Sequence, residues 1–429
     1  MKELDLVKIT GGTYMMGSPA DELWRSADET QQEVSVADFY LAPTELSQAL
    51  FEQAAGYNPS FFNGAALPVE SVSFRQALEA CNALSRNAGL KEVYHFEEGA
   101  ALWDLSADGY RLPTEQEWEY ACRAGSTAPF NVPDSPDPQS CNYYGHYPYN
   151  IEAHYFNSGE LKVQPGEYRN RTVEVDSFAP NAFGLRNMHG NVAEWVISRD
   201  PSSAEAALRQ IYRGGGYNDF AKNLRSAYRG VAPAGYRAAS VGLRVARSAV
   251  PAQGQLRIPL PETALAPQGK VLVVYYSWSG NTKLIADKIA KATGADLLEL
   301  KLKTPYSQSY SKVLDEAQQA LFRQDRPTLV GLSAKLDKYQ TIIVGYPLWW
   351  ASIPMPVASF VEHYDLSGKY VLAFCSNGGG HLGQSVSELL KLLPQTRAGQ
   401  PFEVYYRGDD TLPVRLANWL EAQGLTAKP

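Results

Sequence analysis

The sequence predicts two domains of different fold class: an N-terminal α+β domain with little regular structure and a C-terminal α/β domain with a parallel sheet. The chain has 429 residues, more than a usual single domain. Residues 249–269 are rich in Pro, Ala, Gly and Gln without sustained periodicity, which is typical of a linker. Apolar runs are short before this stretch, whereas strand-like and helix-like runs alternate after it.

Two helices are predicted in residues 1–248. One begins after Ser73 and the other after Thr114, because each of these residues has Gln or Glu three positions on, the pattern of a capping box. The second helix is expected to end near Gly125. The rest of this part is expected to form turns and short strands packed through aromatic side chains, since the chain has 26 Tyr and 8 Trp.

Five apolar runs after the linker predict strands, and each is followed by a helix-like run. The strands are 270–276, 296–302, 340–346, 370–376 and 402–406. The helices are 282–293, 311–323, 353–363, 383–393 and 412–422. Near-continuous apolar strands that alternate with helices predict a five-stranded parallel sheet covered on both faces. The strand order 2-1-3-4-5 fits this pattern.

The loop after the first strand reads SWSGNT and has the features of a phosphate site. Its hydroxyls, its glycine and the start of a helix could supply side-chain bonds, backbone N–H bonds and the positive end of a helix dipole. The Walker pattern is absent, so a nucleotide-hydrolysing loop is not indicated. The candidate residues are Ser277, Trp278, Ser279, Gly280, Asn281 and Thr282.

Two further loops are expected at the same carboxyl edge of the sheet. The loop after the third strand would offer an aromatic wall for a flat ligand. The loop after the fourth strand would let the backbone lie against a planar ring. The candidate residues are Pro347, Leu348, Trp349 and Trp350 in the former loop, and Ser376, Asn377, Gly378, Gly379 and Gly380 in the latter.

Residues 270–429 resemble the flavodoxin family through these loops, SWSGNT and PLWW followed by IPMPV. The resemblance implies FMN as cofactor, with Ser277–Thr282 on the phosphate and the other two loops beside the isoalloxazine ring. The role of that family is one- or two-electron transfer through the bound flavin. GGGHLG at 378–383 also satisfies GxGxxG, but it follows the fourth strand, so NAD binding there is not predicted.

Residues 1–248 resemble the formylglycine-generating enzyme, or sulfatase-modifying factor, family. The motifs that carry the resemblance are GGTYMMGSP (11–19), LPVESVSFRQALEACNALS (67–85), YRLPTEQEWEYACRAG (110–125), APNAFGLRNMHGNVAEW (179–195), YRGGGYNDF (212–220) and VGLRVARS (241–248). The resemblance implies a C-type-lectin-like fold. Active members oxidise a substrate cysteine with two copper-binding cysteines after a GGS-type turn. The matching segment, 211–235, contains no cysteine, so formylglycine generation is not expected.

HGNVAEW at 189–195 matches a structural calcium loop of the same family. The resemblance implies carbonyl ligands from His189, Gly190 and Val192 and a carboxylate ligand from Glu194. The alternative is that Glu194 forms a salt bridge or a hydrogen bond to the backbone. The spacing of the residues does not decide between the two.

The whole sequence is therefore interpreted as an FMN-binding redox protein whose N-terminal domain is a docking or ligand-binding platform or an electron acceptor. Its expected partners are a redox protein or a small-molecule acceptor such as a quinone, with a peptide or small ligand at the N-terminal domain. The alternative is a non-enzymatic lectin-like binding protein on a scaffold flavodoxin fold. The formal net charge of −7 and the absence of a basic stripe argue against nucleic acid and membrane partners. No signal peptide is recognised, so a cytoplasmic protein is expected.

Overall fold

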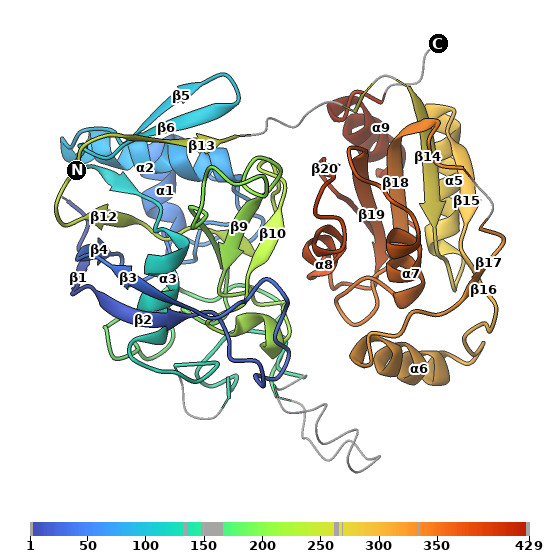
Figure 1. Cartoon of the computed structure of the whole chain (residues 1–429), viewed down its shortest axis with the longest axis horizontal. Coiled ribbons are helices and arrows are strands. Elements are labelled where there is room, and N and C mark those ends of the chain that lie inside the picture. Colours follow the sequence, from blue (N-terminus) through green and yellow to red (C-terminus); the bar gives the residue numbers. More distant parts are fainter. Residues whose placement is uncertain are drawn as a thin grey trace. The chain divides into compact units, whose positions relative to one another are not determined.

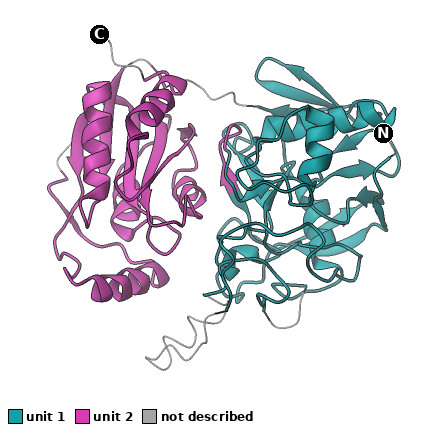
Figure 2. Ribbon diagram, turned by 180° about the vertical axis from the view of Figure 1, so that it is seen from behind, with its two compact units in different colours: residues 1–230, 237–261 teal, residues 231–236, 262–429 magenta. Residues whose placement is uncertain are grey.

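The structure is a computed structural model that describes residues 3–131, 135–146, 149, 166–260, 266–267, 269–332 and 335–425. The chain forms two compact units, each described by itself below (Figure 2). The N-terminal unit comprises residues 1–230 and 237–261, and the C-terminal unit comprises residues 231–236 and 262–429. Within the described residues, no helix has the length and the apolar character needed to cross a membrane.

The N-terminal unit is built from short elements around irregular loops (Figure 1). Its helices are α1 (Gln48–Ala55), α2 (Phe74–Ala88), α3 (Glu115–Arg123) and the 3-10 turn Ala221–Leu224. Its strands are β1 (Val7–Ile9), β2 (Gly12–Met16), β3 (Gln32–Val36), β4 (Phe39–Leu41), β5 (Tyr94–Glu97), β6 (Ala100–Asp104), β7 (Tyr110–Arg111), β8 (Ala193–Val196), β9 (Gln210–Arg213), β10 (Gly230–Ala232), β11 (Val241–Gly242), β12 (Ala246–Ser248) and β13 (Gln255–Pro259). They form small sheets, ordered β1-β4-β12-β7, β10-β9-β8-β11, β13-β6-β5 and β2-β3.

Both capping boxes predicted in this unit are confirmed. The Ser73 and Thr114 side chains each accept a hydrogen bond from the backbone N–H three residues on, and the side chains of Gln76 and Glu117 bond back to the caps. Helix α1 was not predicted. Its N-cap is Ser47, and it ends at Gly56 in a left-handed conformation.

The predicted linker 249–269 is not irregular throughout. Residues Gln255–Pro259 form β13, which pairs antiparallel with β6 and belongs to the N-terminal unit. The strand reads QLRIP, and only Ile258 in it is fully buried. The segment therefore has no apolar run from which a strand could be predicted. Its proline lies at the end of an edge strand, where a missing N–H donor is tolerated.

The C-terminal unit alternates strands and helices as the sequence predicts (Figure 1). Its strands are β14 (Lys270–Tyr275), β15 (Asp296–Glu299), β16 (Lys301–Leu302), β17 (Leu329–Val330), β18 (Tyr339–Pro347), β19 (Tyr370–Asn377), β20 (Arg397–Ala398) and β21 (Phe402–Tyr405). Its helices are α5 (Asn281–Thr293), α6 (Tyr310–Phe322), α7 (Met355–His363), α8 (Ser385–Lys391) and α9 (Leu412–Ala422).

Within the described residues, the main sheet of this unit is parallel and has six strands, because the short β20 is added to the five predicted strands. The pairings run β15–β14–β18–β19, and both β20 and β21 pair with β19. The two-residue β20 is too short to be recognised in the sequence. The run predicted as one strand at 296–302 is divided, because β16 leaves the sheet and pairs antiparallel with β17.

One apolar core holds this sheet against α5 and α9. Strand residues Val273, Ile343, Leu372 and Phe374 are wholly or almost wholly buried with residues from both helices. Each such side chain contributes roughly 1.5–3 kcal/mol through burial of apolar surface. This core fixes the carboxyl ends of β14, β18 and β19 relative to one another, and the three candidate loops begin there.

Candidate functional site

Hydrogen bonds connect the three predicted cofactor loops. The Thr282 hydroxyl, at the start of α5, lies 2.8 Å from the Ser376 hydroxyl at the end of β19. The backbone N–H of Leu348, after β18, donates to the Ser376 carbonyl at 2.8 Å. Thr282 and Ser376 are both buried. The loops that follow β14, β18 and β19 therefore converge on Ser376.

The N-terminus of α5 is open to an anion. Its N-cap is Gly280, which has no side chain that could bond to the first N–H groups of the helix. The Ser277 hydroxyl accepts a hydrogen bond from the N–H of Lys283 at 3.3 Å, which closes the loop onto the first turn. Gly280 has φ of +87°, a conformation that side chains disfavour, so glycine is required here. The uncapped N–H groups and the positive end of the helix dipole suit a phosphate.

Trp349 forms an aromatic wall beside this loop. Its ring lies edge-on to Tyr276 and Tyr306, with ring centroids 5.5 Å and 5.4 Å away. Trp350 has a different role, because its indole N–H donates to the Leu314 carbonyl in α6 at 3.0 Å. The Trp278 indole N–H is likewise bonded elsewhere, because it donates to the Ser307 carbonyl at 2.9 Å. Trp349 thus lies beside two tyrosines, whereas the Trp350 side chain is bonded to α6, and the role of both tryptophans toward a cofactor stays a prediction.

The backbone after Trp349 is unusual. Trp350 and Ala351 have φ of +52° and +55°, a region that costs free energy for residues other than glycine. Two hydrogen bonds between Trp349 and Ser352, at 3.3 Å and 3.0 Å, close the turn. Such strain persists only where surrounding contacts enforce it and is concentrated at functional sites.

The glycine loop packs against the loop after β18. Asn377 accepts a hydrogen bond from the N–H of Gly379 at 2.9 Å. A Cβ atom at Gly380 would lie only 2.9 Å from the end of the Leu348 side chain, so that side chain would have to move to admit a larger residue. Pro347 and Gly378 lie beside these residues in the same loops. The predicted site residues therefore share one edge of the sheet.

Sequence reasoning missed several polar and aromatic residues at this edge. His381 Nδ1 lies 3.0 Å from a carboxylate oxygen of Glu403 on β21. The hydrogen bond and the charge of Glu403 raise the pKa of His381 above its usual value. Glu403 is the register partner of Cys375, the residue before Ser376. That pairing depends on the sheet register, so no signal in the sequence indicated it.

The candidate calcium loop of the N-terminal unit has a different arrangement from the one the resemblance implied. The buried Glu194 carboxylate accepts from the Trp118 indole at 2.7 Å and from the Arg244 guanidinium at 2.8–3.1 Å. A guanidinium on a carboxylate competes with a cation for the same oxygens, so Glu194 does not fit as a calcium ligand. The described residues contain no group of three or more His, Cys, Asp or Glu side chains that could hold a metal. Glu194 therefore forms the salt bridge that the sequence left open as the alternative, and the carbonyl ligands of His189, Gly190 and Val192 stay a prediction.

The His189 side chain has a structural role. Its Nδ1 lies 2.7 Å from the Leu224 carbonyl, and its Nε2 accepts from the Asn131 N–H at 3.1 Å, which fixes a neutral ring. Burial lowers the pKa of His189 to about 4. The Cys122 sulfur lies 3.7 Å from the same ring, and burial raises the pKa of that thiol to about 12. Neither group is ionised near neutral pH, so this is not an activated Cys–His pair.

The four cysteines, Cys81, Cys122, Cys141 and Cys375, are all buried and free. None lies in residues 211–235. The turn where active relatives are expected to carry copper-binding cysteines is formed here by Gly214, Gly215 and Gly216, with the Asp219 carboxylate accepting from the Gly216 N–H at 2.8 Å. The geometry therefore offers no two-thiolate copper site at this turn.

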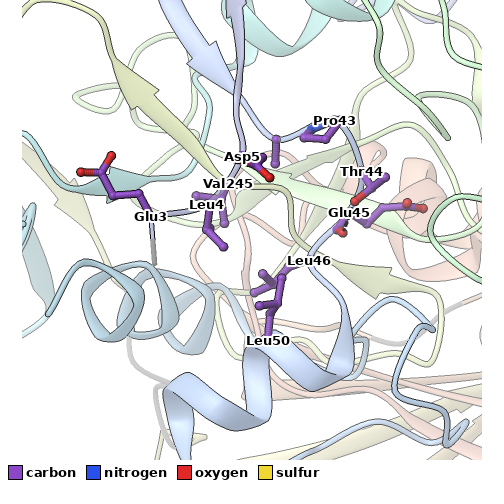
Figure 3. A pocket seen from close by; sticks show the side chains of 10 residues that line it. Glu3, Leu4, Asp5, Pro43, Thr44, Glu45, Leu46, Leu50 and Val245 are labelled. Carbon is purple, nitrogen blue, oxygen red and sulfur yellow. Dashed lines mark hydrogen bonds between the residues drawn. The ribbon is translucent and has the colours of Figure 1, made fainter. Parts of the chain in front are cut away.

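A pocket of about 400 Å³ lies elsewhere in the N-terminal unit (Figure 3). Its lining residues are Glu3, Leu4, Asp5, Ala42, Pro43, Thr44, Glu45, Leu46, Leu50 and Val245. The Glu45 carboxylate accepts from Asn187 at 2.8 Å and from Asn191 at 3.0 Å. Burial raises the pKa of Glu45 to about 8. The pocket combines apolar walls with acidic groups.

Comparison with known proteins places the N-terminal part in a family. The model of the sulfatase-modifying factor enzyme 1-like domain family matches residues 2–249. The chain belongs to this family. Beyond this sulfatase-modifying factor-like part, the flavodoxin family model matches residues 270–421, so the chain joins the two domain types.

Three curated proteins illustrate these similarities. A chaperone protein LppX of Paenibacillus barcinonensis is 30% identical over 270 residues, covering 57% of this chain and 89% of that protein. A formylglycine-generating enzyme of Mus musculus is 26% identical over 294 residues, covering 57% of this chain and 76% of that protein. An NAD(P)H dehydrogenase (quinone) of Azorhizobium caulinodans is 30% identical over 125 residues, covering 28% of this chain and 61% of that protein.

Proposed function

We propose that the C-terminal unit binds FMN and that the protein is a flavin-dependent redox protein, either an electron carrier or an oxidoreductase. One observation carries the proposal. The hydroxyls of Thr282 and Ser376 meet at 2.8 Å, which brings the N-terminus of α5, with glycine at its N-cap, and the glycine loop to the same edge of the sheet. A phosphate site beside an aromatic wall suits a mononucleotide with a planar ring system.

The residues present fit this cofactor. Ser277–Thr282 would hold the phosphate through backbone N–H groups and the hydroxyls of Ser277, Ser279 and Thr282. Trp349 and residues 376–380 would flank the ring. Bound FMN would supply one- or two-electron transfer. The buried positions of Thr282 and Ser376 limit the approach of water to the phosphate end.

The acceptor we favour is a small planar molecule of the quinone type. The similarity to an NAD(P)H dehydrogenase (quinone) over part of the C-terminal unit supports this choice. Reduced nicotinamide or a separate reductase would provide the electrons. A protein acceptor is the alternative for a pure electron carrier.

For the N-terminal unit we propose a binding role without formylglycine-generating activity, on a lectin-like fold. The pocket of about 400 Å³ at Glu45 favours a small ligand or a peptide side chain (Figure 3). The similarity to a chaperone protein is consistent with binding of a polypeptide. This second function does not require the flavin. We place both functions in the cytoplasm.

The visible absorption spectrum of the purified full-length protein, before and after addition of FMN, tests the main proposal. We expect a bound-flavin spectrum in the fraction that elutes with the protein, and bleaching on reduction. A protein that stays colourless after addition of FMN and gel filtration would contradict the redox function. The binding role of the N-terminal unit would then be the leading function.

A further inference from the structure

Two exposed tyrosines lie at the end of β21, at the edge of the sheet that carries the cofactor loops. Tyr405 and Tyr406 are 61% and 51% exposed. Their ring centroids are 4.7 Å apart, with an interplanar angle of 70°. Tyr406 has φ of +46°, in the region that residues other than glycine rarely adopt. An exposed aromatic ring held in a costly backbone conformation suggests a functional requirement.

The tyrosines lie next to the glycine loop. The Tyr406 N–H donates to the Asn377 carbonyl at 2.8 Å. A Cβ atom added at Gly378 would lie 3.4 Å from the Tyr406 hydroxyl, so this side chain reaches the loop. The glycine loop is therefore bordered by Leu348 on one side and by Tyr406 on another.

A protonatable pair lies in the same place. Glu403 is two residues before Tyr405 on β21, and His381 directly follows the three glycines. The two side chains are 3.0 Å apart and are both about one-third exposed. One oxygen of the Glu403 carboxylate, Oε2, is buried and has no hydrogen-bond partner among the described residues, and the other oxygen faces the His381 ring. An imidazole that borders solvent can exchange its proton readily.

We infer that Tyr405 and Tyr406 form a stacking surface for a planar quinone-type acceptor and that His381, oriented by Glu403, is the proton donor to that acceptor. This inference rests on the proposed function, because it places the acceptor at the proposed flavin site. Tyr406 and His381 are the acceptor-contacting residues, and Glu403 is a positioning residue.

The electrons and protons of quinone reduction can all be assigned to a source. A quinone takes up two electrons and two protons to become a quinol. Bound reduced FMN would supply the two electrons and release its own proton to solvent, and a nicotinamide or a reductase would reduce it again. The His381 imidazolium gives one proton to a carbonyl oxygen of the quinone and is reprotonated by solvent. Solvent supplies the other proton.

Among the described residues, β21, β19 and α9 each bring a charged or titratable side chain near His381. Glu403 on β21 favours the protonated ring. Cys375 on β19 donates to the His381 carbonyl at 3.5 Å, and burial raises the pKa of this thiol well above its usual value, so it stays neutral. Arg415 on α9 donates to the backbone carbonyl of Glu403 at 2.8 Å, and this bond leaves the carboxylate to His381. The hydrogen bond and the charge of Glu403 therefore favour the imidazolium form more than in an isolated histidine.

The stacking surface is tested by acceptor binding to the oxidised, FMN-loaded full-length protein. Tyr406→Asn removes the ring, and Asn is the residue other than glycine that best tolerates a left-handed backbone. We expect equilibrium dialysis with menadione to give a Kd raised about two- to tenfold, from the loss of stacking. Tyr57→Asn, at an exposed tyrosine of the N-terminal unit, is the matched control and should leave the Kd unchanged. An unchanged Kd for Tyr406→Asn would overturn the stacking surface.

The proton donor is tested by pH. In the wild type the His381 ring resonance, followed by NMR, should titrate above the usual histidine range, and Glu403→Gln should move the titration to lower pH. The rate of menadione reduction should fall as pH rises through the same value, and in Glu403→Gln it should fall at lower pH. His381→Asn should lower kcat, leave the menadione Kd within about twofold and abolish that limb of the profile. A profile unchanged in both variants would overturn the role of His381.

The outcomes separate this inference from the proposed function. If the flavin spectrum is absent in the wild type, the proposed function fails. If every variant binds FMN like the wild type and Tyr406→Asn also binds menadione like the wild type, only the inference about the acceptor fails.

Discussion

The cores of the two units are built from different kinds of side chain. In the N-terminal unit, Arg213, Arg225 and Arg244 are among the largest fully buried side chains. In the C-terminal unit, the sheet core is formed by residues such as Val273, Ile343 and Leu372. One core therefore depends on paired charges and hydrogen bonds, and the other depends on apolar packing.

The charges of the N-terminal core depend on one another. Arg213 contacts Glu119 and lies 3.3 Å from Glu115, and Arg229 lies 2.5 Å from Glu115. Burial opposes ionisation of Glu115, but the nearby charges of Arg229 and Arg213 outweigh it and lower the pKa of this carboxyl. Removing one partner leaves the others buried without compensation. The buried charges of this core are thus used to hold the fold.

In the C-terminal unit the polar groups of the candidate site lie in the loops rather than in the apolar core. The hydroxyls of Thr282 and Ser376 and the His381–Glu403 pair all lie at the carboxyl edge of the sheet. The sulfatase-modifying factor-like unit, in contrast, uses Glu194 and His189 as internal hydrogen-bond partners. The comparison teaches that ionisable residues in a family motif can be structural when their partners are buried with them.

The largest expected effect comes from breaking the buried charge network. Arg213→Ala should destabilise the N-terminal unit by roughly 3–5 kcal/mol, because Glu115 and Glu119 would be left buried with an incomplete set of partners. Chemical denaturation followed by circular dichroism measures this loss. The exposed pair Lys91–Asp104 provides the control, and Lys91→Ala should change the stability by less than about 1 kcal/mol. Equal effects of the two substitutions would remove the distinction between buried and exposed pairs.

The next effect concerns FMN binding at the carboxyl edge of the sheet in the C-terminal unit. Replacing Thr282 and Ser279 together by alanine should weaken FMN binding, because the phosphate would lose two hydroxyl donors worth roughly 1.5–3 kcal/mol each. A fluorescence titration of FMN gives the affinity. Thr293→Ala is the matched control at the other end of α5, where the hydroxyl donates to Ile289. Unchanged affinity in the double variant would exclude this loop as the phosphate site.

A smaller effect is expected from the buried carboxyl Glu45. Burial raises its pKa from the usual 4.5 of a glutamate to about 8. Between these values the folded state keeps a proton that the unfolded state releases, so the stability from this group is present at low pH and is lost as pH rises toward 8. Denaturation at about pH 5.5 and about pH 8.5 should therefore show a smaller loss of stability in Glu45→Gln than in the wild type. An identical pH dependence would show that Glu45 does not titrate in this way.

The smallest expected effect is no effect at all. Incubation with a cysteine-containing sulfatase peptide and copper should yield no aldehyde, since residues 211–235 contain no cysteine and all four cysteines are buried. Mass spectrometry of the peptide provides the measurement. A formylglycine product above the level of the protein-free sample would show that the family's oxidation can proceed without the cysteine pair.

The sequence alone determined the features that depend on local chemistry. The capping boxes at Ser73 and Thr114, the alternation of strands and helices after residue 270, and the missing cysteines all follow from neighbouring residues or from fixed periods. The family resemblance of each part followed from short motifs of the same kind and was confirmed by the family comparisons.

Only the tertiary structure decided how distant polar groups pair. Glu194 reaches Arg244 and Trp118, which lie 50 and 76 positions away in the chain, and His381 meets Glu403 because β21 pairs with β19. The different contacts of Trp349 and Trp350 depend on a turn in which Trp350 and Ala351 are left-handed. Neither residue is glycine, so the sequence did not indicate this turn. The physical reason is common to these cases: hydrogen bonds and ion pairs are short-range and directional, so their partners are set by sheet register and packing rather than by the local sequence.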